Sequence, residues 1–204
     1  MITIIDYGLG NIRAFVNVYE RLNIKTKIAR IGNDIKGATK IILPGVGAFD
    51  YAMSQLNASG MRHELEKQVL ENNIPVVGIC VGMQILAKSS DEGKLPGLGW
   101  IDAKVQLFDT SKIPYKTRLP HMGWNSISPV KTNPLLSGFN NESRFYFLHS
   151  YYFVCNNKDD IISTTEYGIS YASAINSNNI YGIQFHPEKS HSNGIQLLNN
   201  FAKI

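Results

Sequence analysis

The chain changes from a strand pattern to a helix pattern within the stretch Ile74-Pro75-Val76-Val77-Gly78-Ile79-Cys80-Val81-Gly82-Met83-Gln84. Its first half is short, apolar and β-branched, which is typical of a buried strand, whereas residues 81–88 suit a helix. Gly78 and Gly82 flank the cysteine at the spacing of a nucleophile elbow, a strained turn that projects one side chain over the edge of a sheet. The stretch therefore predicts a buried strand that delivers Cys80 to a sheet edge.

This position favours a nucleophilic role for Cys80. The amide donors at the N-terminus of the following helix favour the thiolate, which is the reactive form of cysteine. The competing interpretation is structural, because free cysteine is among the residue types most often buried and Gly-x-Cys-x-Gly is a loose pattern. The cysteine by itself leaves both interpretations open.

A second motif, His186-Pro187-Glu188, supplies the other groups that a cysteine nucleophile needs. Residues 181–185 are strand-like and would deliver His186 at their end. Glu188 can hold the imidazole through its distal nitrogen, as the third member of a catalytic triad does. The alternative is a surface histidine in a turn, and the presence of Cys80 favours the triad.

The first half of the chain alternates between strand and helix patterns, which indicates βαβ units and a parallel sheet. Ligands of such sheets gather at the carboxyl ends of the strands. Strands are predicted at residues 2–7, 25–29 and 40–43, and helices at residues 11–22, between 49 and 72, and finally at 191–201. Aromatic and β-branched runs between turns predict antiparallel strands at residues 100–108, 121–128, 144–154, 161–165 and 171–175.

The third predicted strand runs into Leu43-Pro44-Gly45-Val46-Gly47. A fixed proline torsion and two glycines allow backbone amides to turn toward the upper edge of the sheet. Cysteine attack on an amide carbonyl makes a tetrahedral oxyanion, and one well-placed donor lowers that barrier by roughly 3 to 4 kcal/mol. Val81 can supply a second amide. A simple strand-to-helix turn is the alternative interpretation of the loop.

Length, charge and cysteine content limit the classes of protein to which the chain can belong. A chain of 204 residues that is 44% hydrophobic predicts one well-buried domain over residues 1–204. The net charge of +4 is scattered without a basic run, so we expect no nucleic acid partner. Two cysteines without a Cys-x-x-Cys pair or zinc spacing predict neither a disulfide framework nor a metal site. Without an apolar signal core or a spanning stretch, we expect a cytoplasmic protein that does not bind membranes.

Two nucleotide-binding motifs are incomplete in this sequence. Gly8 and Gly10 lack the third glycine of a dinucleotide fingerprint, and no acidic residue follows at the expected distance. The sequence also contains no Gly-Lys-Ser or Gly-Lys-Thr loop. No cofactor is predicted.

Together these motifs resemble the class I, or triad, glutamine amidotransferases, in residues 43–47, 78–84 and 184–188. Over nearly the whole chain the sequence is also similar to the glutaminase-subunit family of imidazole glycerol phosphate synthase. That closer resemblance lies in Ile5-Asp6-Tyr7-Gly8, Gly10-Asn11, Leu43-Pro44-Gly45-Val46-Gly47-Ala48-Phe49, Pro120-His121-Met122-Gly123-Trp124-Asn125, His149-Ser150-Tyr151 and Phe185-His186-Pro187-Glu188-Lys189-Ser190. It implies a flavodoxin-like α/β fold, a mostly parallel sheet flanked by helices with an additional antiparallel portion.

The resemblance implies hydrolysis of L-glutamine to glutamate and ammonia, which a heterodimer would pass to a (β/α)8-barrel cyclase subunit. There the ammonia would react with a phosphoribulosyl imidazole-carboxamide intermediate, giving imidazole glycerol phosphate and the purine precursor AICAR in histidine biosynthesis. By position, Cys80 forms a glutamyl thioester, His186 transfers protons and Glu188 orients it. The other implied positions are an oxyanion loop of Gly45, Val46 and Gly47, a glutamine pocket with Gln84, Ser150 and Tyr151, and a cyclase face with Asn11, Trp124 and Lys189.

Taken one at a time, several of these residues have plainer interpretations. A tryptophan after glycine on a strand is most often a core residue, and an asparagine after glycine is often a helix cap. Lys189 alone would be a solvated lysine. We predict hydrogen-bonded structural histidines at 121 and 149, packing residues at Met122 and Phe185, and an inert thiol at Cys155.

Other functions stay open at this point. Residues 95–102 and 190–194 also resemble a paralogous branch that supplies ammonia to a cyclase-like partner for amidination of cell-surface sugars. A stand-alone γ-glutamyl cysteine hydrolase with the same elbow would act without a partner. A non-catalytic binding module would keep the fold, although the presence of Cys80, His186 and Glu188 together argues against it.

Overall fold

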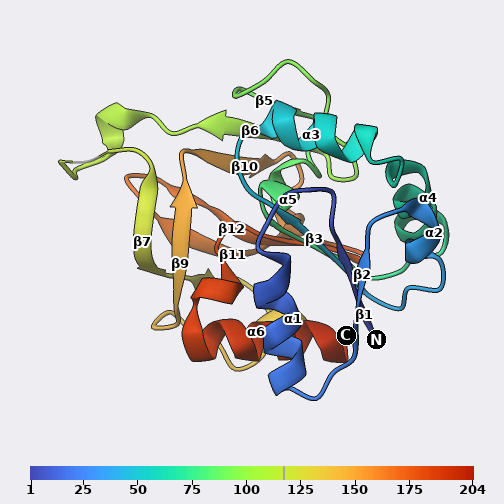
Figure 1. Ribbon diagram of the computed structural model, residues 1–204. Helices are drawn as coiled ribbons and strands as arrows, with labels where there is room; N and C mark the ends of the chain where they lie inside the picture. The colour runs from blue at the N-terminus through green and yellow to red at the C-terminus, as the bar shows by residue number, and fades with distance from the viewer. Residues whose placement is uncertain (117) are drawn as a thin grey trace.

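The computed structural model describes residues 1–116 and 118–204. Its centre is a mixed sheet with the strand order β2-β1-β3-β4-β13-β12-β10-β6-β5 (Figure 1). Strand β11 (Ile161–Glu166) extends the sheet by pairing with β12 and with β8 (Ser128–Pro129). The other strands are β1 (Ile2–Ile5), β2 (Thr26–Ala29), β3 (Ile41–Gly45), β4 (Val76–Cys80), β5 (Ser89–Ser90), β6 (Ala103–Leu107), β10 (Tyr151–Cys155), β12 (Ser170–Ser177) and β13 (Ile180–Ile183).

Parallel pairing dominates the half of the sheet that carries the N-terminal strands. The strands β2, β1, β3 and β4 pair in parallel, and β13 joins them beside β4 in the same direction. Beyond β13 the pairs are antiparallel, except for the short parallel pair of β5 and β6. The predicted α/β fold with an additional antiparallel portion is therefore confirmed.

Helices cover both faces of the parallel strands (Figure 1). On one side lie α1 (Ile12–Arg21) and α6 (His191–Lys203), which contact each other; the Tyr19 hydroxyl donates to the Leu198 carbonyl at 3.1 Å. On the other side lie α2 (Gly32–Ile35), α3 (Phe49–Ala58), α4 (Arg62–Glu66) with its π-helical continuation Lys67–Glu71, and the short α5 (Val81–Gln84). Both helix layers bury their apolar faces against the sheet.

A separate two-stranded sheet stands at one end of the molecule (Figure 1). It pairs β7 (His121–Ser126) with β9 (Arg144–His149) in antiparallel register. The prediction of one strand over residues 144–154 is wrong, because the chain leaves this small sheet at Ser150 and enters the main sheet as β10. The break places Ser150 between two sheets.

The predicted helix over residues 81–88 is also shorter than expected, since α5 ends at Gln84. The peptide groups that follow bond to a later segment of the chain. Leu98 N donates to Ile85 O at 2.8 Å, and Lys88 N donates to Ala103 O at 2.9 Å. Pairing with the segment that leads into β6 therefore ends the helix after one turn.

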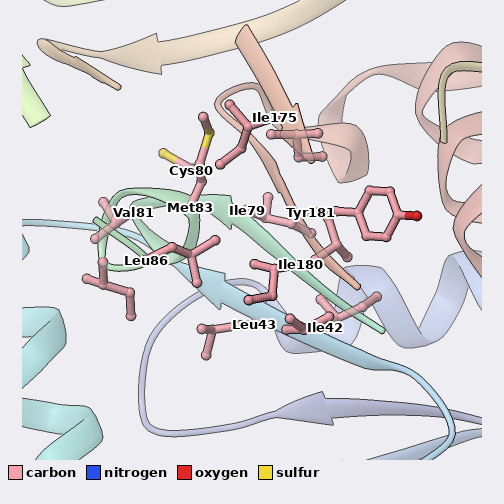
Figure 2. Packing of buried hydrophobic residues seen from close by; sticks show 14 of the residues in the cluster. Ile42, Leu43, Ile79, Cys80, Val81, Met83, Leu86, Ile175, Ile180 and Tyr181 are labelled. Atoms are coloured by element: carbon pink, nitrogen blue, oxygen red, sulfur yellow. The ribbon is translucent and has the colours of Figure 1, made fainter. Parts of the chain in front are cut away.

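The elbow itself has the predicted geometry. Cys80 has a φ of +56°, which strains any residue with a β-carbon. A β-carbon on Gly78 would lie 2.4 Å from Gly82 O, and one on Gly82 would lie 1.9 Å from Leu43 O. Figure 2 shows Cys80 at the end of its strand, with Val81, Met83 and Leu86 on the turn that follows. The two glycines let strand and turn pack backbone against backbone.

We predict that Gly82→Ala destabilises the fold by about 3 kcal/mol, because its new methyl group would overlap the β3 backbone, which cannot move aside cheaply. Urea unfolding measures this loss. Gly32→Ala is the matched control, since its β-carbon would meet neighbours at an ordinary 3.5 Å, and it should cost less than about 1 kcal/mol. Equal stability of the two variants would contradict the close-packed elbow.

Candidate active site

A cavity of about 300 Å³ opens where β3 and β4 end. Its lining includes Cys80 and His186, together with Val46, Gly47, Val81, Gln84, Ser150 and Tyr151. Parallel strands bring their carboxyl ends to one edge of a sheet, which explains why residues so distant in the sequence meet here. The cavity is large enough for a small amino acid side chain and its backbone groups.

Cys80 is 4% exposed and carries a free thiol. Its Sγ lies 3.9 Å from the Leu148 carbonyl oxygen, and Gln184 Nε2 points at it from the same distance. The His186 imidazole lines the same cavity and interacts electrostatically with the Cys80 side chain. The sulfur therefore has a histidine in its surroundings and an open cavity in front of it.

His186 follows β13 and is fixed through its backbone. Its N–H donates to Tyr146 O at 2.8 Å, and its carbonyl accepts from Ser190 Oγ at 2.6 Å. The ring nitrogen Nδ1 lies 2.8 Å from Glu188 Oε1, so the predicted orienting contact is present. These bonds leave the other side of the ring free to face Cys80.

Charges around His186 decide its protonation. Burial alone would lower the pKa of this imidazole, but hydrogen bonds to Cys80 and Glu188 and the negative charge of both groups raise the pKa to about 10. The Glu188 side chain, on the turn Pro187–Lys189, is only 4% exposed. The neighbouring Cys80 and Glu188 side chains thus favour the protonated form of the His186 ring.

The predicted oxyanion loop divides into two parts. Val46 and Gly47, with a φ of +91° at Gly47, line the cavity beside Val81. Gly45 pairs with Cys80 in the sheet register and lies beneath the cavity, where a β-carbon would come within 2.5 Å of Gly82 N and 3.0 Å of the Tyr7 hydroxyl. Gly45 therefore packs beneath the loop and does not itself line the cavity.

Gln84 is built into the cavity wall. Its side-chain nitrogen donates to Tyr151 O at 3.2 Å and to Gln184 Oε1 at 3.1 Å. With both amide hydrogens in use, Gln84 can offer a ligand only its carbonyl oxygen. Ser150 and Tyr151 complete this wall at the break between β9 and β10.

Sequence reasoning missed Glu92, which also lines the cavity. Glu92 Oε2 accepts from Phe49 N at 2.8 Å, at the start of α3. The Asp50 carboxylate in turn accepts from the backbone amides of Lys94 and Leu95 at 2.9 to 3.1 Å, which fixes the loop. The only sequence signal was an acidic pair before a glycine, which is common in solvated loops.

The residues predicted for a partner face do not all reach this cavity. Lys189 lines it, with Nζ 5.6 Å from the centre of the Tyr146 ring. Trp124 lies outside, 39% exposed and stacked on His191 at 5.1 Å, and Asn11 caps α1 by accepting from Ala14 N at 3.2 Å. Met122 is 60% exposed on β7, so its prediction as a packing residue is wrong. Alternation along β7 turns this side chain outward.

The remaining single-residue predictions agree with the structure. Phe185 is fully buried. Cys155 is a buried free thiol whose pKa burial raises to about 12, as expected of an inert cysteine. His121 and His149 are buried and hydrogen-bonded. Within residues 1–116 and 118–204, no helix is long and apolar enough to cross a membrane.

The fold and the site together define a class of protein. Residues 3–204 match the family model of class-I glutamine amidotransferases, and the chain belongs to that family. A crystal structure of a glutamine amidotransferase has the same fold, with a TM-score of 0.75 and 18% identity over 98% of each chain.

Within the family, the chain groups with subunits named HisH. It is 53% identical to the imidazole glycerol phosphate synthase subunit HisH of Bdellovibrio bacteriovorus and 48% identical to that of Leptospira borgpetersenii, over 100% of both chains in each case. The resemblance predicted from the motifs is therefore confirmed at the level of the family and of this subgroup.

The charge arrangement predicts that Glu188→Gln lowers the pKa of His186 from about 10 toward the ordinary value of 6.5, because a neutral amide no longer stabilises the imidazolium. Histidine ¹⁵N chemical shifts followed over a pH titration measure this change. Glu20→Gln, which removes an exposed carboxylate on α1, is the control and should leave the His186 titration unchanged. A His186 titration that is the same in both variants would rule out the charge coupling.

Proposed function

We propose that the chain is the glutaminase subunit of an imidazole glycerol phosphate synthase. The observation that carries this proposal is the meeting of Cys80, His186 and Glu188 at one cavity, in a chain whose full-length relatives bear that subunit's name. Residues 1–204 act as one amidotransferase domain in this proposal. The reaction is hydrolysis of L-glutamine, in a cytoplasm that keeps both thiols reduced.

The first half of the reaction makes a thioester. The Cys80 thiolate attacks the side-chain amide carbon of glutamine, and the amides of Val81 and of the loop through Val46 and Gly47 stabilise the tetrahedral oxyanion. The His186 imidazolium gives its proton to the departing nitrogen, and ammonia leaves. Its raised pKa supports this order, because the proton is already on the ring when the attack begins.

The second half restores the enzyme. The now neutral His186 takes a proton from water, and the resulting hydroxide attacks the glutamyl thioester. The second tetrahedral intermediate collapses to glutamate and the Cys80 thiolate, with the proton retained on His186. Glu188 holds the ring in one orientation throughout and stabilises its positive charge.

The charged ends of glutamine need partners in the same cavity. Glu92 is the carboxylate available for the substrate ammonium group, since its Oε2 is fixed by Phe49 N and the side chain lines the cavity. Gln84, Ser150 and Tyr151 supply the remaining polar contacts in this proposal.

Ammonia leaves toward a (β/α)8 cyclase in a heterodimer, where it completes imidazole glycerol phosphate and AICAR. Exposed Met122 and Trp124 on β7, together with Asn11 and Lys189, form the surface that we assign to this partner. An exposed apolar pair on one strand face is typical of an interface. The acceptor lies in the partner, so the test of the pathway requires both subunits.

We expect Cys80→Ser to reduce ammonia release from glutamine by about 10³-fold or more, because the hydroxyl is a far weaker nucleophile. Cys155→Ser, at the other buried cysteine, is the control and should retain activity if it folds. Co-expressed with a cyclase subunit, the wild-type chain should rescue a histidine auxotroph that lacks its own glutaminase subunit. The Cys80→Ser variant should need added ammonium, and failure of the wild type would exclude this pathway.

Glu92→Gln should raise the KM for glutamine roughly tenfold to a hundredfold, since it removes one charged hydrogen bond to the substrate ammonium group. Steady-state kinetics of the complex give this value. Glu71→Gln, at an exposed site after α4, is the charge-matched control and should leave KM unchanged. A KM unaffected by Glu92→Gln would remove Glu92 from the pocket.

A further inference from the structure

A series of buried polar groups that the glutaminase mechanism does not use begins on the inner face of β7. Asn125 Nδ2 lies 3.3 Å from His121 Nε2, and His121 Nδ1 lies 3.1 Å from the Tyr171 hydroxyl. The same hydroxyl lies 3.1 Å from His149 Nε2, and His149 Nδ1 lies 2.7 Å from Tyr151 O. The two histidines and Tyr171 are almost completely buried.

A second series reaches the same carbonyl from the nucleophile. Gln184 Nε2 points at Cys80 Sγ from 3.9 Å, and Gln184 Oε1 accepts from Gln84 Nε2 at 3.1 Å. Gln84 Nε2 also donates to Tyr151 O at 3.2 Å. Both series therefore converge on the carbonyl oxygen of Tyr151, which forms part of the cavity wall.

In the first series, which runs from Asn125 to the Tyr151 carbonyl, one arrangement of hydrogen atoms gives every contact a donor and an acceptor. A carbonyl can only accept, so His149 carries its hydrogen on Nδ1 and its Nε2 accepts from the Tyr171 hydroxyl. Tyr171 then accepts from His121 Nδ1, and His121 Nε2 accepts from Asn125. The orientation of the Asn125 amide is set by Ser126 N, which donates to Asn125 Oδ1 at 2.8 Å.

Burial keeps the His121 and His149 rings neutral, and aromatic neighbours hold the His121 ring in place. Burial lowers the pKa of His121 to about 4, and burial, together with the neighbouring His121 and His186, lowers the pKa of His149 to about 3. The His121 ring is stacked between Phe147 at 4.8 Å and Tyr167 at 4.0 Å. In such a dry environment an unpaired ring nitrogen is costly, so the loss of one member disturbs the next.

We propose that His121 and Tyr171 are positioning residues for glutamine. They hold the His149 ring against the Tyr151 carbonyl and thereby fix the wall of the cavity at Ser150, where the chain passes from β9 to β10. This inference rests on the proposed function, because it assigns the network to glutamine binding.

The cavity wall at Ser150 lies between two different sheets, which is why a side-chain hydrogen bond is needed to hold it. His149 pairs with β7 in the small sheet, whereas Tyr151 pairs with β6 in the main sheet. The bond from His149 Nδ1 to Tyr151 O closes the turn between them.

The test is Tyr171→Phe in the complex purified with its partner subunit. Removal of the hydroxyl should raise the KM for glutamine about fivefold while kcat stays within about twofold, since the triad is untouched. Tyr19→Phe is the matched control, because it also removes a buried tyrosine hydrogen bond, to Leu198 O at 3.1 Å. It should lower the urea unfolding midpoint to a similar extent and leave KM unchanged.

Histidine ¹⁵N spectra give a readout that does not depend on activity. Wild-type protein should show His121 and His149 as neutral Nδ1–H tautomers, and Tyr171→Phe should shift the His149 Nε2 resonance. An Nε2–H tautomer at His149, or equal KM values for Tyr171→Phe and Tyr19→Phe, would overturn the proposal. A wild type without glutaminase activity would overturn the proposed function instead, and the tautomer measurement would still decide the network.

Discussion

The parallel pairing of β13 with β4 is the constraint on which the rest of the structure depends. Its register places Gly182 beside Gly78 and Ile183 beside Ile79, so both strands end at the same edge of the sheet. The approach is close, since a β-carbon on Gly182 would meet Met83 Cγ at 2.7 Å. An antiparallel β13 would have sent His186 to the opposite edge, and no local motif could then have brought it to Cys80.

Electrostatics then turns this proximity into a reactive arrangement. A buried imidazolium is unfavourable alone, because burial removes it from water. Here the interactions with Cys80 and Glu188 outweigh that cost, and the pKa of His186 rises to about 10. Removal of one partner would leave the buried ring without part of this compensation, which is why such a set is costly to break one member at a time.

The cavity also needs a fixed wall, which Cys80, His186 and Glu188 do not provide. One wall is formed where the chain crosses from the small sheet to the main sheet at Ser150, whose carbonyl accepts from Phe108 N at 3.3 Å. The side chains of His149 and Gln84 add to this bond, since both donate to the Tyr151 carbonyl. The small sheet, with its exposed Met122 and Trp124, is thereby joined to the cavity wall by polar contacts.

The sequence by itself determined the elements whose rules are local. The elbow follows from Gly78 and Gly82 around Cys80, and the contact of His186 with Glu188 spans only one residue. Tertiary structure decided the end of α5 at Gln84, the strand break at Ser150, the exposure of Met122 and the place of Glu92 in the cavity. Each of these depends on which distant segment supplies hydrogen bonds or covers a side chain, and periodicity along one stretch of chain carries no information about that neighbour.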